Sequence, residues 1–277
     1  MTNWGALGQL AQSYKLAGTN DYISNLVPNT TVNTKGNYVE FVSSTPFDSE
    51  GLLITFYSLT YGNVDNLFDI AMGAESSEVD IISNILTSQS LSYHLARRYE
   101  FPLKIKAGTR ISGRSQGEYS GATNFRVSIN LLRGSWSYAR GFAVCDTYGA
   151  NTADSGGVNI DPGGTANTKG SWTEIISSTT RDAKGFNLLV GNGSNFSRTG
   201  SAYYWNVDVG IGGSGSEQII FSNWGMVCHG TSDALFPQTT PFIPVHIPAG
   251  SRLSVRAACS GTGSASRLFD AVIYTFS

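Results

Sequence analysis

Charged residues are scarce in this sequence: they make up 14% of its 277 positions, against roughly a quarter in an average soluble domain. The net charge is −2, and the longest basic cluster is Arg97-Arg98. Proteins that bind nucleic acid present basic patches, because contacts with phosphates supply much of their affinity. The sequence therefore predicts no nucleic-acid partner.

Long hydrophobic runs are absent as well. No apolar run approaches the roughly 20 residues that a membrane-spanning helix needs. The first five residues lack the basic and apolar regions of a secretory signal. We therefore expect a chain that is made in a cytoplasm and does not insert into a membrane.

Cysteine and histidine, the residues most useful for metal binding, are rare. Neither the three cysteines nor the three histidines have the spacing of a zinc site, and an odd number of cysteines does not suit a disulfide framework. These residues are Cys145, Cys228, Cys259, His94, His229 and His246. No Gly-x-Ser-x-Gly nucleophile motif occurs either. We predict no metal, no cofactor and no enzymatic activity, and interpret the cysteines as small apolar core residues.

What the sequence does contain is glycine and aromatic residues, with 32 Gly, 13 Tyr, 14 Phe and 5 Trp. Aromatic and β-branched residues suit a pleated sheet, while Gly, Asn and Ser suit turns. Short strands joined by many loops have this composition. An all-β protein is the prediction.

An internal repeat dominates the chain. The segment Asn33-Thr34-Lys35-Gly36 recurs as Asn167-Thr168-Lys169-Gly170, a shift of 170 − 36 = 134. The match continues through an aromatic residue, a glutamate, a Ser-Ser-Thr run, an aspartate and a glycine in each copy. Those residues are Tyr38, Glu40, Ser43, Ser44, Thr45, Asp48 and Gly51, then Trp172, Glu174, Ser177, Ser178, Thr179, Asp182 and Gly185.

A second matched segment follows further along each copy. Residues 101–114 match residues 243–256, and the shift there is 250 − 108 = 142, so the loops differ in length while the strands persist. The shared Ala-Gly-(Thr/Ser)-Arg element predicts a tight hairpin connection with glycine at positive φ.

These repeats predict two tandem modules, at 33–132 and 167–277, separated by a linker region at 133–166 that contains one extra strand. Apolar residues alternate with polar ones inside each module, as in strands with one buried face. We predict jelly-roll-like antiparallel β-sandwiches.

The N-terminal segment, 1–32, has a different pattern. Trp4, Leu7, Leu10 and Tyr14 fall three or four apart, which predicts a short helix with one apolar side. A helix this short is marginal alone, so it must dock. It docks either on its own modules or on another chain, and in the second case these four residues form an anchor.

Two further groups are candidates for binding or chemistry. Tyr203, Tyr204 and Trp205 are the densest aromatic cluster and are a hypothetical glycan-binding surface, although alternation predicts that at least one of them packs in the core. Carboxylate pairs at Asp65 with Asp69 and at Glu75 with Glu78 are better explained as solvated loop charges than as a glycosidase pair.

The motifs Asn-Thr-Lys-Gly-(Asn/Ser)-(Tyr/Trp)-x-Glu and (Phe/Ile)-Pro-x-x-Ile-x-Ala-Gly-(Thr/Ser)-Arg-(Ile/Leu) give the chain a family resemblance. It resembles the small β-sandwich modules of virion structural proteins of tailed bacteriophages, of tail, fibre or head-decoration type. The resemblance covers both modules and implies no catalytic residue. It implies a virion protein, assembled in the host cytoplasm, whose partners are other virion proteins and further copies of itself.

The sequence thus predicts a non-enzymatic structural protein that decorates a capsid, neck or tail, as a homo-oligomer. The alternative is an adhesin or fibre protein that binds glycan on the host surface. A polysaccharide depolymerase is a third and weaker hypothesis.

Overall fold

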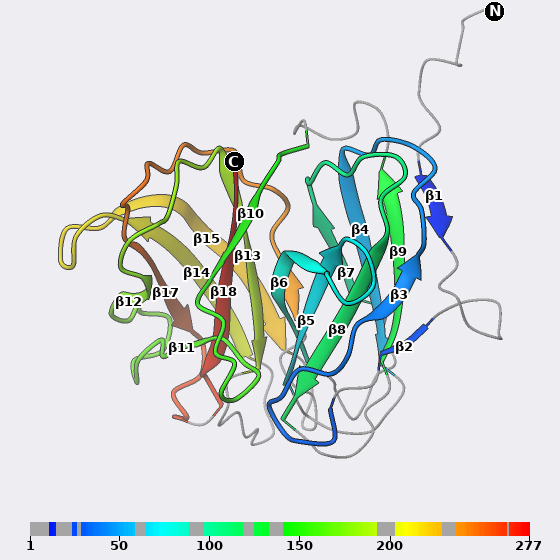
Figure 1. Cartoon of the computed structure of the whole chain (residues 1–277). Helices are drawn as coiled ribbons and strands as arrows, with labels where there is room; N and C mark the ends of the chain where they lie inside the picture. The colour runs from blue at the N-terminus through cyan, green and yellow to red at the C-terminus, as the bar shows by residue number, and fades with distance from the viewer. Residues whose placement is uncertain are drawn as a thin grey trace, which may run out of the picture.

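The computed structural model describes residues 11–14, 24–26, 29–58, 65–88, 97–118, 125–132, 141–192, 203–228, 237–264 and 266–277. Every regular element in these residues is a strand, so the predicted all-β class is confirmed (Figure 1). None of the described residues forms a helix, and so no described segment is a helical membrane span.

The first half of the chain forms two antiparallel sheets. One has the strand order β1-β9-β4-β7, with β2 also paired to β9, and the other has the order β3-β8-β5-β6. The strands are β1 (Ala11–Tyr14), β2 (Ser24–Leu26), β3 (Val39–Val42), β4 (Gly51–Ser58), β5 (Asp65–Met72), β6 (Val79–Ser88), β7 (Arg97–Phe101), β8 (Ile111–Gly117) and β9 (Phe125–Leu132).

The second half repeats this arrangement strand for strand. Its sheets have the orders β10-β18-β13-β16, with β11 also on β18, and β12-β17-β14-β15. The strands are β10 (Cys145–Tyr148), β11 (Val158–Ile160), β12 (Thr173–Ile176), β13 (Gly185–Asn192), β14 (Tyr203–Ile211), β15 (Gln218–Cys228), β16 (Gln238–Thr239), β17 (Leu253–Cys259) and β18 (Phe269–Phe276). The duplication read from the sequence is therefore a duplication of topology.

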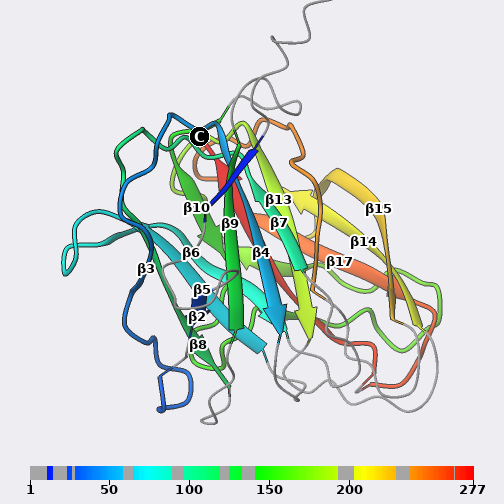
Figure 2. The same ribbon diagram turned by 90° about the vertical axis from the view of Figure 1, so that its right-hand side faces the viewer.

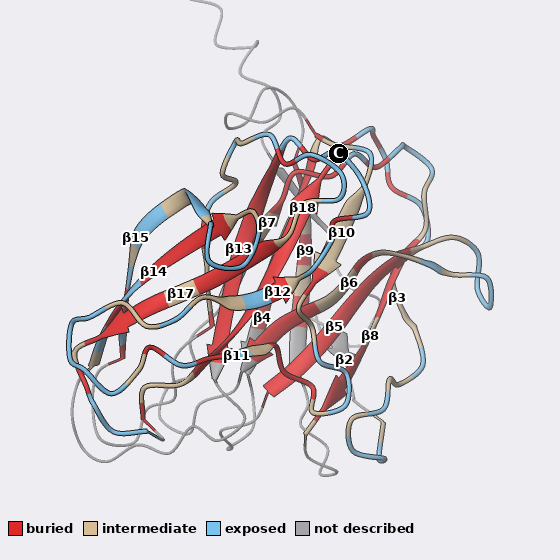
Figure 3. Cartoon of the chain, turned by 90° about the vertical axis from the view of Figure 1, so that its left-hand side faces the viewer, coloured by how far each residue is buried: buried red, intermediate tan, exposed pale blue. Residues whose placement is uncertain are grey.

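Alternation places one apolar set of side chains between the two sheets of each half. Leu52, Ile54 and Phe56 of β4 face the first core, and Trp205 and Val207 of β14 face the second. Figure 3 shows β14, β17 and β18 buried along most of their length. The jelly-roll designation stays a prediction.

The Ala-Gly-(Thr/Ser)-Arg element of the repeat, predicted as a hairpin connection, has the predicted glycine conformation. Gly108 and Gly250 have φ values of 79° and 81°, a region that side chains with a Cβ rarely adopt. Each glycine lies in the turn that leads to β8 or β17. The glycine-dependent turn is confirmed, but the predicted hairpin is wrong: the turn leads from one sheet to the other, because β7 and β8 belong to different sheets, as do β16 and β17.

The predicted N-terminal helix needs a correction at four residues. Ala11–Tyr14 is strand β1, which pairs antiparallel with β9 so that Tyr14 lies opposite Ile129. Pairing with a strand edge prevails over a helical pattern that is too short to be stable alone. Trp4, Leu7 and Leu10 lie outside the described residues, so the anchor role stays a prediction.

The two halves are in direct contact. The core of the first half includes Leu189, Val272, Tyr274 and Phe276 of the second half. Figures 1 and 2 show β6 and β7 lying next to the sheet that contains β13. Strands β10 and β11 lie in the predicted linker region and pair with β18. Whether 33–132 and 167–277 fold independently stays a prediction.

Candidate functional site

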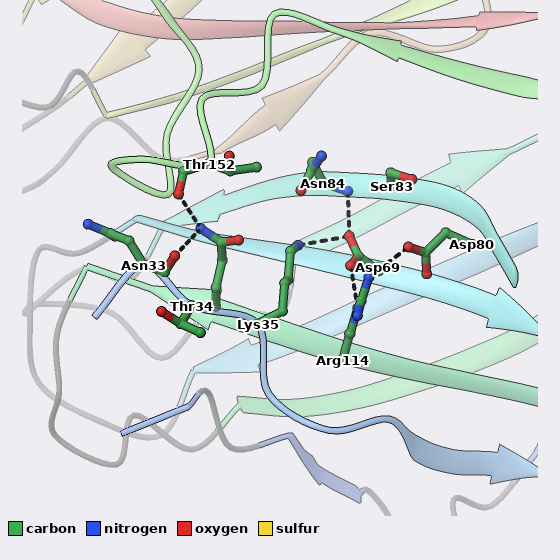
Figure 4. A pocket seen from close by; sticks show the side chains of 10 residues that line it. Asn33, Thr34, Lys35, Asp69, Asp80, Ser83, Asn84, Arg114 and Thr152 are labelled. Atoms are coloured by element: carbon green, nitrogen blue, oxygen red, sulfur yellow. Dashed lines mark hydrogen bonds and ion pairs between the residues drawn. The ribbon is translucent and has the colours of Figure 1, made fainter. Parts of the chain in front are cut away.

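A buried aspartate occupies the middle of the first half. Asp69, on β5, is 1% exposed. Its carboxylate accepts hydrogen bonds from Lys35 Nζ (2.8 Å) and Arg114 Nε (2.8 Å), and from the backbone amide of Asn84 (2.8 Å) (Figure 4). Burying a carboxylate requires such partners. The pKa of Lys35 is lowered, because burial outweighs the attraction of Asp69.

The second half contains the same arrangement around Asp208, on β14. Lys169 Nζ lies 2.6 Å and Arg256 Nε 3.0 Å from its carboxylate oxygens, and the Asn223 amide donates at 2.9 Å. Burial opposes ionisation of Asp208, but these three hydrogen bonds outweigh it and lower its pKa. Asp69 and Asp208 are therefore equivalent positions.

The aromatic position of the repeat completes each cluster. The guanidinium of Arg114 lies 4.5 Å from the ring centroid of Tyr38, and that of Arg256 lies 4.4 Å from the centroid of Trp172. A cation over an aromatic face is attracted by the ring quadrupole. This contact explains why an aromatic residue stands three positions after the lysine in both copies.

The arginine of the Ala-Gly-(Thr/Ser)-Arg element forms a second ion-pair cluster in each half. Arg110 donates to Glu40 (2.7 Å) and to Glu78 (3.0 Å). Arg252 donates to Glu174 (2.6 Å) and Glu217 (2.9 Å) in the same way. The glutamate of the first motif and the arginine of the second thus belong to one contact.

Of the carboxylates named from the sequence, Asp69 and Glu78 take part in these ion pairs. Glu75 is exposed in the turn between β5 and β6, and Asp65 is buried at the start of β5. The interpretation of all four as solvated loop charges is wrong for Asp65 and Asp69, which are buried, and for Glu78, whose side chain is 5% exposed and pairs with Arg110. Among the described residues, no group of three or more His, Cys, Asp or Glu side chains is placed to hold a metal ion.

A pocket of about 420 Å³ lies beside the Asp69 cluster, where the two halves meet. Its wall includes Thr152, from the loop between β10 and β11, and Gln116, whose side-chain amide donates to the Thr152 carbonyl (2.8 Å). The other lining residues, shown in Figure 4, are Asn33, Thr34, Lys35, Asp69, Asp80, Ser83, Asn84 and Arg114. All ten are polar.

The charges in this pocket balance. Lys35 and Arg114 oppose Asp69 and Asp80, and Arg114 Nη2 also donates to Asp80 (2.9 Å). The side-chain oxygen of Asn84 is buried and has no hydrogen-bond partner among the described residues. A small uncharged molecule with a hydroxyl donor matches this chemistry better than an ion.

The structure separates the three aromatic residues proposed for glycan binding. Trp205 is 1% exposed in the second core, and its indole N–H donates to the Arg267 carbonyl (2.8 Å). Tyr203 is half-buried and packs edge-on against Trp205. Tyr204 alone is exposed, at 60%. Alternation buries one of the three, as expected, and leaves one ring for a ligand.

The sequence reasoning missed the Lys-Asp-Arg clusters and the pocket. Both lysines and both arginines stand in the repeated motifs, and each aspartate interrupts an apolar strand, which is itself a signal of a buried ion pair. The pairing was not visible because the lysine and the aspartate lie 34 and 39 residues apart.

Comparisons with known proteins give a likeness of architecture alone. No protein-family model and no curated protein matches the sequence. Among solved structures, the chain is similar to PNGF-II, at 7% identity and a TM-score of 0.39, over 96% of this chain and 63% of that one.

Two further solved structures align over most of the chain. The tandem CBM22 modules of Paenibacillus barcinonensis Xyn10C align at 10% identity and a TM-score of 0.28, over 96% of this chain and 91% of that one. An archaeal virus protein with a triple jelly roll aligns at 10% identity and a TM-score of 0.21, over 94% of this chain and 59% of that one. The chain thus spans under two thirds of the PNGF-II chain, and TM-scores this low assign no function.

Proposed function

We propose that this chain is a non-enzymatic structural protein of a tailed-bacteriophage particle, which decorates the capsid, neck or tail. The residues that carry the sequence resemblance to such proteins occur in both halves of the chain. They lie at equivalent positions of the duplicated topology.

The observation that supports this role most is that the repeated polar residues form structural ion pairs and hydrogen bonds. In both halves the lysine and both arginines of the repeated motifs each form an ion pair with a carboxylate whose side chain is at most 5% exposed. The Thr45 and Thr179 hydroxyls donate to the carbonyls of Lys106 and Pro248. Residues that are repeated because they hold a sheet together favour an architectural role over a catalytic one.

Assembly in a symmetric particle suits a duplicated β-sandwich. Its two halves offer broad sheet faces, and many copies turn weak individual contacts into stable attachment. The partners that we propose are other virion proteins and further copies of this chain.

Purified particles test the proposal. Particles from cells that produce this chain should contain it in many copies after density-gradient purification, and labelling with an antibody against the folded protein should mark regular positions. Recovery of the chain only in the soluble fraction, with unlabelled particles, would contradict the virion role.

An adhesin is the second candidate, favoured by the exposed ring of Tyr204 and by the polar pocket, in which the charges balance. It predicts saturable binding on an array of host glycans. Tyr204→Ala should weaken binding at the ring and Thr34→Lys binding in the pocket. Lack of saturable binding to any glycan would remove this candidate.

A further inference from the structure

The first half shows how the open side of one of these sandwiches is closed. Strand β6 is an edge strand of its sheet, and yet its side chains Ile82, Ile85 and Leu86 are fully buried. The cover is the outer face of the β10-β18-β13 sheet, which contributes Leu189, Val272, Tyr274 and Phe276 to the first core.

Side chains of the second half also satisfy the free backbone edge of β6. The Tyr274 hydroxyl donates to the Asn84 carbonyl (2.7 Å) and accepts from the Leu86 amide (3.2 Å). The Thr147 hydroxyl donates to the Ser83 carbonyl (2.8 Å). An uncovered strand edge would leave these groups open to pairing with another chain.

Strand β15 is the equivalent of β6 in the second half. Asn84 and Asn223 have φ values of 56° and 54°, and each amide donates to the buried aspartate of its own half. The shift is 223 − 84 = 139, which places Phe221, Trp224 and Gly225 at the positions of Ile82, Ile85 and Leu86.

This equivalent strand is uncovered (Figure 3). Phe221 and Trp224 are half-buried and Gly225 is exposed, although their counterparts in β6 are fully buried. Ile219 and Val227, on the same strand, are 48% and 46% exposed. Within the part of the chain that the structure describes, no side chain hydrogen-bonds the Ser222 or Asn223 carbonyl or the Gly225 amide.

The β10-β18-β13 sheet that covers β6 has an equivalent in the first half, the β1-β9-β4 sheet. The face of β4 and β9 that points away from the first core corresponds to the covering face of β13 and β18 (Figure 2). The shift is 274 − 130 = 144, which places Ser128 and Asn130 at the positions of Val272 and Tyr274. Both are half-buried, and Thr55 of β4, which pairs with Ser128 on the same face, is 3% exposed.

The β15 surface and the outer β4-β9 face complement each other in size and in hydrogen bonding. Where β6 has isoleucines, β15 has Phe221 and Trp224, and where the covering sheet has Val272 and Tyr274, β9 has the smaller Ser128 and Asn130. An asparagine amide both donates and accepts, as the Tyr274 hydroxyl does between a carbonyl and an amide.

We propose that β15 of one chain docks on the outer β4-β9 face of a second copy, and so repeats between chains the contact that joins the two halves within one chain. The contact is head-to-tail, because it uses two different surfaces. It therefore produces rings or filaments rather than closed pairs. It is independent of the proposed virion role, since it needs only this protein.

The test uses the full chain in solution, with light scattering after gel filtration over a range of concentrations. Gly225→Arg fills the β15 surface, and a Cβ at Gly225 meets no atom within 4 Å, so the fold accepts it. Ser128→Arg fills the opposite surface. Ala74→Arg, in the exposed turn between β5 and β6, is the matched control.

We expect assembly of the wild type and of Ala74→Arg, and monomers for each blocking variant. An equimolar mixture of Gly225→Arg and Ser128→Arg should form one-to-one dimers, because each variant keeps the surface that the other lacks. Each variant must first show a cooperative thermal melt, which establishes that it is folded. If Ser128→Arg does not fold, Asn130→Lys replaces it.

Several results would overturn the contact. A wild type that stays monomeric at its highest soluble concentration, or a Gly225→Arg variant that assembles as the wild type does, excludes β15. If only Gly225→Arg blocks assembly, β15 meets a surface other than the β4-β9 face, and the proposed contact is wrong. Failure of the chain to enter particles would contradict the virion role but not this contact.

Discussion

At the scale of single residues, Asp69 and Asp208 have the same surroundings. Each is 1–2% exposed and faces a lysine, an arginine and a backbone amide. Removing one partner of a buried ion pair costs more than the pair contributes, because the remaining charges stay buried without compensation. Exposed ion pairs contribute little.

Asp208→Ala should therefore lower the free energy of unfolding by about 3 kcal/mol, because Lys169 and Arg256 lose their buried counter-charge. Asp69→Ala should have a similar effect. Lys106→Ala, which removes an exposed pair with Asp48, should change it by less than about 1 kcal/mol. Urea unfolding measures all three, and equal effects for Asp208→Ala and Lys106→Ala would refute the structural role of the cluster.

Asp270, on β18, gives a pH-dependent prediction. Burial raises its pKa to about 7, although the Gly157 amide and the Asn159 side chain donate to its carboxylate. The folded chain thus holds this proton more tightly than the unfolded chain does. Its contribution to stability is complete below about pH 4 and is lost as the pH rises through about 7.

Asp270→Asn removes this titration. Between about pH 4 and pH 8 the wild type should lose more stability than the variant, by up to about 1.4 kcal/mol for each unit of the pKa shift. Urea unfolding at a series of pH values measures the difference. Parallel profiles for the two proteins would show that Asp270 titrates normally.

At the scale of elements, the internal repeat extends further towards the N-terminus than the motifs of the two modules indicated. Strands β1 and β2 are equivalent to β10 and β11, and the shift of 148 − 14 = 134 already aligns Tyr14, Asn25 and Pro28 with Tyr148, Asn159 and Pro162. These strands are three or four residues long, and so few residues give no detectable alternation. The stronger cue at residues 1–20 was a helical spacing.

The period-two pattern and the turn glycines, by contrast, were sufficient for the strand class and for the tight turns at Gly108 and Gly250, but the predicted hairpin is wrong, because each turn joins strands of two different sheets. They are local features, fixed by residues a few positions apart. The pocket and the contact between the halves join residues far apart in sequence, such as Gln116 with Thr152 and Tyr274 with Asn84. Without a topology, the sequence does not place such residues together.

Removal of residues 2–20 tests the role of β1. Because β1 pairs with β9, we expect the deletion to expose the edge of β9 and to lower the melting temperature by several degrees. Removal of residues 2–10 leaves β1 in place and should leave the melting temperature unchanged. If the shorter deletion abolishes assembly, Trp4, Leu7 and Leu10 act as the anchor, and if both deletions melt as the wild type, β1 adds no stability.

At the scale of the whole molecule, side chains of the second half complete the core of the first half. Tyr274 of β18 is fully buried, packs edge-on against Phe101 (5.3 Å between ring centroids) and hydrogen-bonds the backbone of β6. The Asn187 side chain donates to the Glu100 carbonyl (2.7 Å). These contacts join the two halves of the chain.

Tyr274→Phe keeps the ring and removes the hydroxyl, so the Asn84 carbonyl and the Leu86 amide lose a partner in a buried place. The free energy of unfolding should fall by about 1–3 kcal/mol. Tyr204→Phe, at an exposed tyrosine, should change it by less than about 0.5 kcal/mol. Equal effects in chemical unfolding would mean that this contact does not bind the halves.

Calorimetric unfolding of the full chain tests most directly whether the duplicated sandwiches form a single structural unit. Because side chains of the second half complete the first core, the account predicts one transition in which the calorimetric and van't Hoff enthalpies agree. Two separate transitions, or a van't Hoff enthalpy well below the calorimetric one, would show two independent modules and would contradict it.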